Sequence, residues 1–147
     1  MMELGWSAPP HPVDAGTAKR GILWQHGRIR ALLDKARAVA DAALDGHAPS
    51  VDAVAPAIVD LRSTIEVHLT FEETVLLPLL RDDALGSQRA GRLLDEHTRQ
   101  REVLAALHRE AEAHPQLPTL AAKLAFLTSW LIADMAEEER CLSTSEP

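Results

Sequence analysis

The stretch His68-Leu69-Thr70-Phe71-Glu72-Glu73 places a histidine and a glutamate four residues apart, which puts both side chains on one face of a helix. A second stretch, Asp134-Met135-Ala136-Glu137-Glu138-Glu139, repeats the pattern with an aspartate in the position of the histidine. In both stretches the pair interrupts a stripe of apolar residues that should face a core. Burying such groups is costly unless something neutralises them. The two stretches therefore predict a metal cluster inside a bundle of helices.

Apolar residues recur every three or four positions through four long segments, and no β-type alternation is sustained. We expect helices over about residues 17–44, 50–80, 87–113 and 119–142, with Thr17 as the N-cap of the first helix. Short connections make successive helices antiparallel neighbours. The sequence therefore predicts an all-α fold, an up-down-up-down four-helix bundle over residues 17–147. A proline-rich, irregular N-terminal arm over residues 1–16 precedes it.

Polar residues with metal-binding side chains lie on all four expected stripes. We compared how far each such residue lies from the end of its helix, at about 1.5 Å per residue. On adjacent helices, these residues differ in position along the bundle axis by less than about one helical turn. We therefore expect them to meet in one layer of the core. The candidate ligands are three histidines and three carboxylates: His26, His68, Glu72, His97, Asp134 and Glu138.

The two halves of the chain repeat one another. Leu23-x-x-His26-x-Arg28-x-Arg30-x-x-Leu33 recurs 71 residues later, and the pattern (His/Asp)-x-x-x-Glu-Glu-x-x-Leu recurs after 66 residues. The repeat predicts two helix hairpins related by a pseudo-two-fold axis. Imidazoles and carboxylates together suit iron, and glutamate can bridge two metals. One metal would then take His26 and His68, the other His97 and Asp134, with Glu72 and Glu138 as bridges.

Composition excludes several classes of protein. A length of 147 residues favours one domain, and a net charge of −7 disfavours nucleic acid as a partner. The single cysteine, Cys141, rules out an internal disulfide and any cysteine-rich zinc or iron–sulfur site. No uninterrupted apolar run reaches about 18 residues, so we expect no membrane span. Residues 1–12 lack the pattern of a secretory signal, and we expect a cytoplasmic protein.

These motifs resemble the hemerythrin-like, or HHE cation-binding, family over about residues 18–142. His26, His68, Glu72 and His97 match the family's ligand positions. The resemblance implies a non-haem di-iron site with an oxo or hydroxo bridge, which binds oxygen or changes its redox state. Two positions depart from the hemerythrin pattern. Arg101 stands where the third helix would have a second histidine, and the fourth helix has Asp134-x-x-x-Glu138.

The departures leave alternatives open. Arg101 either enters the layer and pairs with Glu138 or Asp134 in place of one metal, or lies outside it like its counterpart Arg30, and we favour the second arrangement. We expect the neighbouring Glu73 and Glu139 to lie on the solvated surface, and His108 to have no ligand role.

Three functions compete. The first is a di-iron protein that senses or handles oxygen, peroxide, nitric oxide or iron. The second is a small di-iron peroxidase or oxidase, and the third is a metal-poor interaction module. The sequence names no protein partner.

Overall fold

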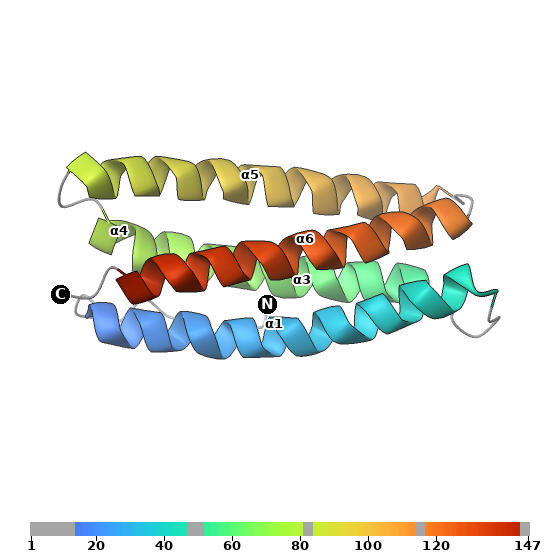
Figure 1. The fold of residues 1–147 in the computed structure, drawn as a ribbon. Helices are drawn as coiled ribbons and strands as arrows, with labels where there is room; N and C mark the ends of the chain where they lie inside the picture. The colour runs from blue at the N-terminus through green and yellow to red at the C-terminus, as the bar shows by residue number, and fades with distance from the viewer. Residues whose placement is uncertain (1–13, 47–51, 81–83, 114–116, 145–147) are drawn as a thin grey trace, which may run out of the picture.

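The computed structural model describes residues 14–46, 52–80, 84–113 and 117–144, and the regular structure of these residues is entirely helical. Figure 1 shows the helices as rods side by side, with a chain direction that alternates from each rod to the next. The predicted all-α fold is confirmed for the described residues, and most of the predicted arm lies outside them. The rods are α1 (Ala15–Leu44), α3 (Val54–Phe71) continued by η1 (Glu72–Leu76) and α4 (Leu77–Leu80), α5 (Ala84–Glu112) and α6 (Leu117–Thr144).

The predicted helix ends differ from the structure by a few residues. α1 begins at Ala15, and its N-cap is Asp14, whose carboxylate accepts a 2.7 Å hydrogen bond from the backbone N–H of Thr17. The prediction of Thr17 as N-cap was therefore wrong, because aspartate and threonine are both good caps and the pattern did not separate them. α6 includes Pro118 in its first turn, where the missing N–H of proline costs little. The predicted start of the second helix, residue 50, lies outside the described residues.

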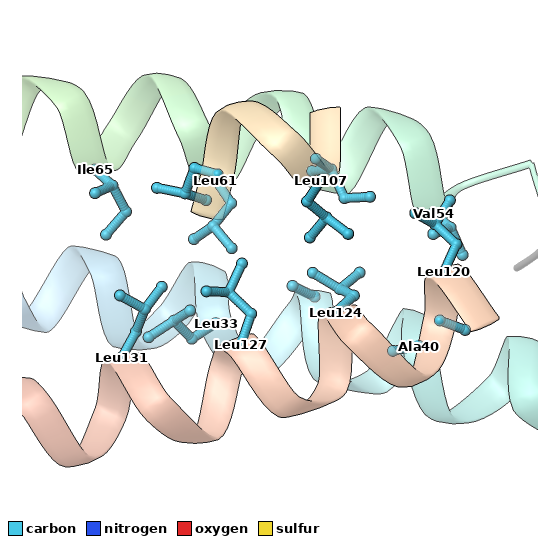
Figure 2. Packing of buried hydrophobic residues seen from close by; sticks show 14 of the residues in the cluster. Leu33, Ala40, Val54, Leu61, Ile65, Leu107, Leu120, Leu124, Leu127 and Leu131 are labelled. Carbon is cyan, nitrogen blue, oxygen red and sulfur yellow. The ribbon is translucent and has the colours of Figure 1, made fainter. Parts of the chain in front are cut away.

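An aliphatic core fills the half of the bundle that contains the end of α1 and the start of α6. Figure 2 shows leucines of α6 facing residues of α3 and α5 across the centre of this half. Each fully buried aliphatic side chain contributes roughly 1.5–3 kcal/mol relative to exposure. The large side chains of this aliphatic core are less than about a tenth exposed: Leu33, Leu61, Leu107, Leu124, Leu127 and Leu131.

Toward the other end of the bundle, the buried residues become polar. His26 continues the buried stripe of α1 between Ile22 and Ile29, and its side chain is completely buried. The buried residues Ile22, His26, Ile29, Leu33, Ala36 and Ala40 follow the spacing of three and four that predicted this helix. The aliphatic half therefore holds the helices together, and the polar half lies on the same stripes without interrupting their periodicity.

A π-helical turn interrupts the second rod where it reaches the polar layer. The backbone N–H of Leu77 donates to the carbonyl of Glu72, five residues earlier. Pro78 gives a physical reason, because proline lacks the N–H that would bond the carbonyl of Thr74 and its ring would clash with that carbonyl. The Thr74 hydroxyl donates instead to the carbonyl of Thr70 at 2.9 Å. The apolar periodicity predicted a continuous α-helix over residues 50–80, and the π-helical turn departs from that prediction.

One described helix, Pro118–Ser143 within α6, is long and apolar enough to cross a membrane by length and composition alone. The expectation of no spanning segment rested on uninterrupted apolar runs and did not register this helix. A single such helix is weak evidence, because the core helix of a bundle meets the same criterion. Here its leucines Leu120, Leu124 and Leu127 are buried in the bundle core.

Candidate metal centre

Four of the six predicted ligands meet in the polar half of the bundle. His26, His68, Glu72 and Glu138 each offer one ligand atom, and these atoms all lie within 4.8 Å of one another. His26 Nε2 lies 3.0 Å from Glu138 Oε1 and 3.2 Å from His68 Nε2, and His68 Nε2 lies 2.6 Å from Glu72 Oε1. Atoms bound to one ion at about 2.1 Å are themselves about 3–3.4 Å apart. The three contacts given above lie near this spacing, so the four residues, hereafter the four-residue group, could hold a metal ion.

His97 lies beside this group, on the far side of Glu72. Its Nε2 atom is 3.6 Å from Glu72 Oε1, and both side chains are almost completely buried. Among the described residues, neither His97 Nε2 nor the second carboxylate oxygen of Glu72 has a hydrogen-bond partner. Buried polar atoms without partners are uncommon and call for an explanation. Two unpartnered donor atoms next to the four-residue group are what a second ion would bind.

Asp134 is not brought into the four-residue group. Its Oδ2 atom accepts a 2.6 Å hydrogen bond from Gln100, and its carboxyl group pairs with that of Glu96. Direct ligation by Asp134 stays a prediction.

Each of two imidazoles is held from behind by a carboxylate. His26 Nδ1 donates to Glu139 Oε2 at 2.7 Å, and Arg30 binds the same oxygen at 2.7 Å. A carboxylate on one ring nitrogen fixes the proton there, so that the other nitrogen faces inward as a free donor atom. The arrangement orients His26 Nε2 toward the four-residue group.

The second half of the bundle repeats this arrangement. His97 Nδ1 donates to Glu73 Oε2 at 2.7 Å, and Arg101 donates to both oxygens of Glu73 at 2.7 and 3.0 Å. The offsets of the sequence repeat relate these three residues to His26, Glu139 and Arg30. The pseudo-two-fold relation therefore extends beyond the candidate ligands to the residues that orient them.

His68 has a different partner from the other two imidazoles. Its Nδ1 atom donates to the amide oxygen of Gln25 at 2.8 Å. In the second half, the repeat places Glu96 in the position of Gln25 and Asp134 in the position of His68. The amide–imidazole pair of one half is thus a carboxyl–carboxyl pair in the other.

The outer residues correct one prediction and confirm another. Glu73 and Glu139 are about a quarter exposed and hold histidines, so the prediction that both are solvated surface residues was wrong. Arg101 lies outside the layer, as predicted, and pairs with Glu66 and Glu73. The missed signal was present in the repeat, since each half has a glutamate doublet and an arginine four residues after its histidine. Helical periodicity alone assigns the second glutamate to the surface.

The buried carboxylates have displaced pKa values. Burial opposes ionisation of Glu72, but the hydrogen bond from His68 and the nearby imidazole of His97 outweigh it and hold the pKa of Glu72 below its usual range. Burial, together with the charge of Glu72, raises the pKa of Glu138 to about 8. Burial and the neighbouring Glu96 raise the pKa of Asp134 to about 7. Glu138 and Asp134 therefore tend to keep their protons near neutral pH, and a bound cation would favour their ionised forms.

A large groove lies away from this layer. A hollow of about 910 Å³ runs between α5 and α6 over the aliphatic half, lined by apolar side chains such as Val103, Phe126 and Trp130. None of the six predicted ligands lines it. The candidate metal ligands therefore lie in the polar layer and not in the groove.

A buried group of imidazoles and carboxylates at one level of an all-helical fold defines a cation-binding helical protein. A family model described as the hemerythrin HHE cation binding domain matches residues 21–143. The chain therefore belongs to this family, and the resemblance seen in the sequence is confirmed. No curated protein and no solved structure matches the chain.

Proposed function

We propose that this protein binds two iron ions and uses them to sense or handle a small molecule such as oxygen, peroxide or nitric oxide. The four-residue group would hold one ion. His97 and the second oxygen of Glu72 would hold the other, with Asp134 as a further ligand. The observation that carries the proposal is the pair of buried, unpartnered donor atoms on His97 and Glu72 beside the four-residue group.

The types of side chain in the candidate site, as well as their spacing, fit iron. Imidazole and carboxylate are the ligands of non-haem iron sites, and the family binds metal cations. Zinc also accepts these ligands, so metal identity is an outcome of the test below. When bound, iron would supply one-electron redox changes and open positions for an exogenous molecule.

The residues of this chain would orient and tune such a site. Glu139 and Glu73 hold the Nδ1 protons of His26 and His97, which makes the inward nitrogens stronger donors. Glu72 faces both halves, because His68 and His97 lie on either side of it. With three imidazoles and three carboxylates, the site would favour the ferric state.

A metal-poor interaction module is less well supported. In that reading, arginines would neutralise the carboxylates of the layer. Arg30 and Arg101 pair instead with Glu139 and Glu73, outside the layer, and leave Glu72 without an arginine partner among the described residues. The alternative function is a small di-iron oxidase or peroxidase. We further propose that the protein is cytoplasmic and binds neither nucleic acid nor a membrane.

Metal analysis of protein purified after expression with added iron tests the proposal. We expect about two irons per chain and a near-ultraviolet band from an oxo bridge. Single-turnover reactions with oxygen and peroxide show whether the centre reacts. The same reactions with excess oxidant and reductant then separate a sensor from an enzyme, because only the enzyme turns over repeatedly. Protein that retains no metal after supplementation with either iron or zinc would reject the metal centre.

A further inference from the structure

A cavity of about 200 Å³ adjoins the candidate metal centre. It lies between α4, α5 and α6, and Leu76, Leu93 and Leu142 form much of its apolar wall. Asp134 and Glu138 also line it. Because Glu138 belongs to the four-residue group, the cavity and the group share one side chain.

The corresponding place in the other half of the bundle is filled. The offsets of the repeat relate Arg92 and Glu137, on the cavity wall, to Gly21 and Phe71. A Cβ atom on Gly21 would lie only 2.7 Å from Cζ of Phe71, so the phenylalanine ring packs directly on the glycine backbone. One half therefore has a ring where the other half has a hollow, although both halves share the same arrangement of glutamates and histidines.

We propose that this cavity is the route by which small molecules reach the metal centre, and that Phe71 closes the equivalent route in the other half. The reaction at the end of the route rests on the proposed function, whereas the route itself is a property of the protein. A volume of about 200 Å³ has room for several water molecules, each of which takes about 30 Å³ in the liquid. Its wall surface is mainly apolar, with leucines between the charged side chains of Arg89, Arg92, Glu96 and Glu137, and the cavity suits small molecules such as hydrogen peroxide and oxygen.

The chain contains the means to block the cavity reversibly. Cys141 lines the cavity, is exposed, and is the single cysteine of the sequence. Benzyl methanethiosulfonate would convert it to a benzyl disulfide, because the thiolate attacks sulfur and methanesulfinate leaves. A thiol reductant would restore the free cysteine. The matched control is Cys141→Ser, which the reagent cannot modify.

The first measurement is the oxidation of the ferrous protein by hydrogen peroxide in a stopped-flow instrument. One peroxide takes two electrons from two ferrous ions and two protons from solvent, and leaves as two waters. We expect benzylation to slow this oxidation about tenfold or more, at unchanged iron content, and reduction of the disulfide to restore it. Treated Cys141→Ser should react like untreated protein. In benzylated protein, Phe71→Leu should recover part of the rate by opening the second route.

The second measurement needs no metal. Xenon enters apolar cavities, so xenon added to the metal-free protein should shift the leucine methyl resonances of Leu93 and Leu142, and benzylation should abolish the shift. If xenon still shifts these methyls in protein that binds no iron, the proposed function fails and the cavity stands. An unchanged peroxide rate after benzylation, at full iron content, would overturn the route while leaving the metal centre intact. Absence of the xenon shift in unmodified protein would also overturn it.

Discussion

The two halves of the bundle share one design and differ on one side of it. Both contain a histidine, a glutamate behind it and an arginine that binds the glutamate, at equivalent positions. They differ at His68 against Asp134, at Gln25 against Glu96, and at the Phe71 ring against the cavity. The carboxylates and arginines that orient the imidazoles are thus the same in both halves, whereas the surroundings of the proposed second metal position are more acidic and less filled.

This difference shows how a symmetric scaffold acquires an asymmetric site. The shared residues determine where donor atoms point. The divergent residues determine whether the metal ligands are imidazoles or the harder carboxylates, and whether a small molecule can approach. We therefore expect exogenous ligands to react at the second position, next to the cavity, and the first position to have a more structural role.

The largest effect is expected at Glu72, the residue that faces both halves. Glu72→Ala removes a carboxylate that lies beside His68 and His97, so both positions should weaken and iron content should fall from about two per chain to below one. His108→Ala is the control, because His108 pairs with Arg62 and Glu112 away from the layer and should not affect iron content. Equal iron content in the two variants would reject the ligand assignment.

The comparison of His68 with Asp134 tests the divergent position itself. Asp134→Ala should reduce iron to about one per chain, and Asp134→His should raise the reduction potential, because an added imidazole stabilises ferrous iron. His68→Ala should cost more metal than Asp134→Ala, since His68 belongs to the four-residue group. If Asp134→Ala retains two irons and only loses stability, Asp134 is a partner of Gln100 and Glu96 and not a ligand.

The shared outer residues should give matched effects in the two halves. Glu73→Gln and Glu139→Gln keep the shape of the side chain but weaken the hydrogen bond that fixes each imidazole, so metal affinity should fall roughly 10–100-fold in each. Glu137→Gln alters the neighbouring glutamate, which is exposed and pairs with Arg140, and should leave affinity unchanged. Zinc titrations of the three variants provide the measurement, and the hypothesis fails if all three have the same affinity.

Sequence periodicity predicted what depends on a regular helix. His26 lies on a stripe of threes and fours, and its burial followed from that stripe. Glu73 and Glu139 escaped prediction because helical periodicity assigns the second glutamate of each doublet to the surface, whereas each side chain hydrogen-bonds an imidazole of a neighbouring helix. The partners of Asp134 also escaped, since hydrogen bonds between α5 and α6 depend on side-chain geometry across two helices.

The carboxylates should make the metal-free protein less stable as pH rises. The pKa of Glu138 is raised to about 8 and that of Asp134 to about 7, so the folded state binds more protons than the unfolded state between their ordinary values, 4.5 and 3.8, and the raised ones. Stability from these groups is therefore present at acidic pH and lost as pH rises toward 8. The raised pKa values of His26 and His97 act in the same direction above their ordinary value of 6.5. Glu72 acts oppositely, and its contribution is lost as pH falls below about 4.5.

Bound metal should reverse this trend, because metal ligands must lose their protons. Melting temperatures measured from pH 5 to 8, with chelator and with metal, provide the test. A metal-free protein that becomes more stable toward pH 8 would contradict the assigned pKa directions.

The smallest expected effect concerns the ring that fills the first half. Gly27 lies in the interior of α1 with open space around it, so Gly27→Ala should stabilise the protein by about 0.5–1 kcal/mol through helix propensity. Gly21 lies in the same helix, but its new Cβ would meet the ring of Phe71, and overpacking typically costs about 1–3 kcal/mol. Gly21→Ala should therefore be the less stable of the two in urea denaturation. Adding Phe71→Leu to Gly21→Ala should recover most of the difference, because a shorter side chain leaves room for the methyl group. Equal stabilisation by both alanines would mean that the ring moves aside freely, and that Phe71 is not a fixed plug.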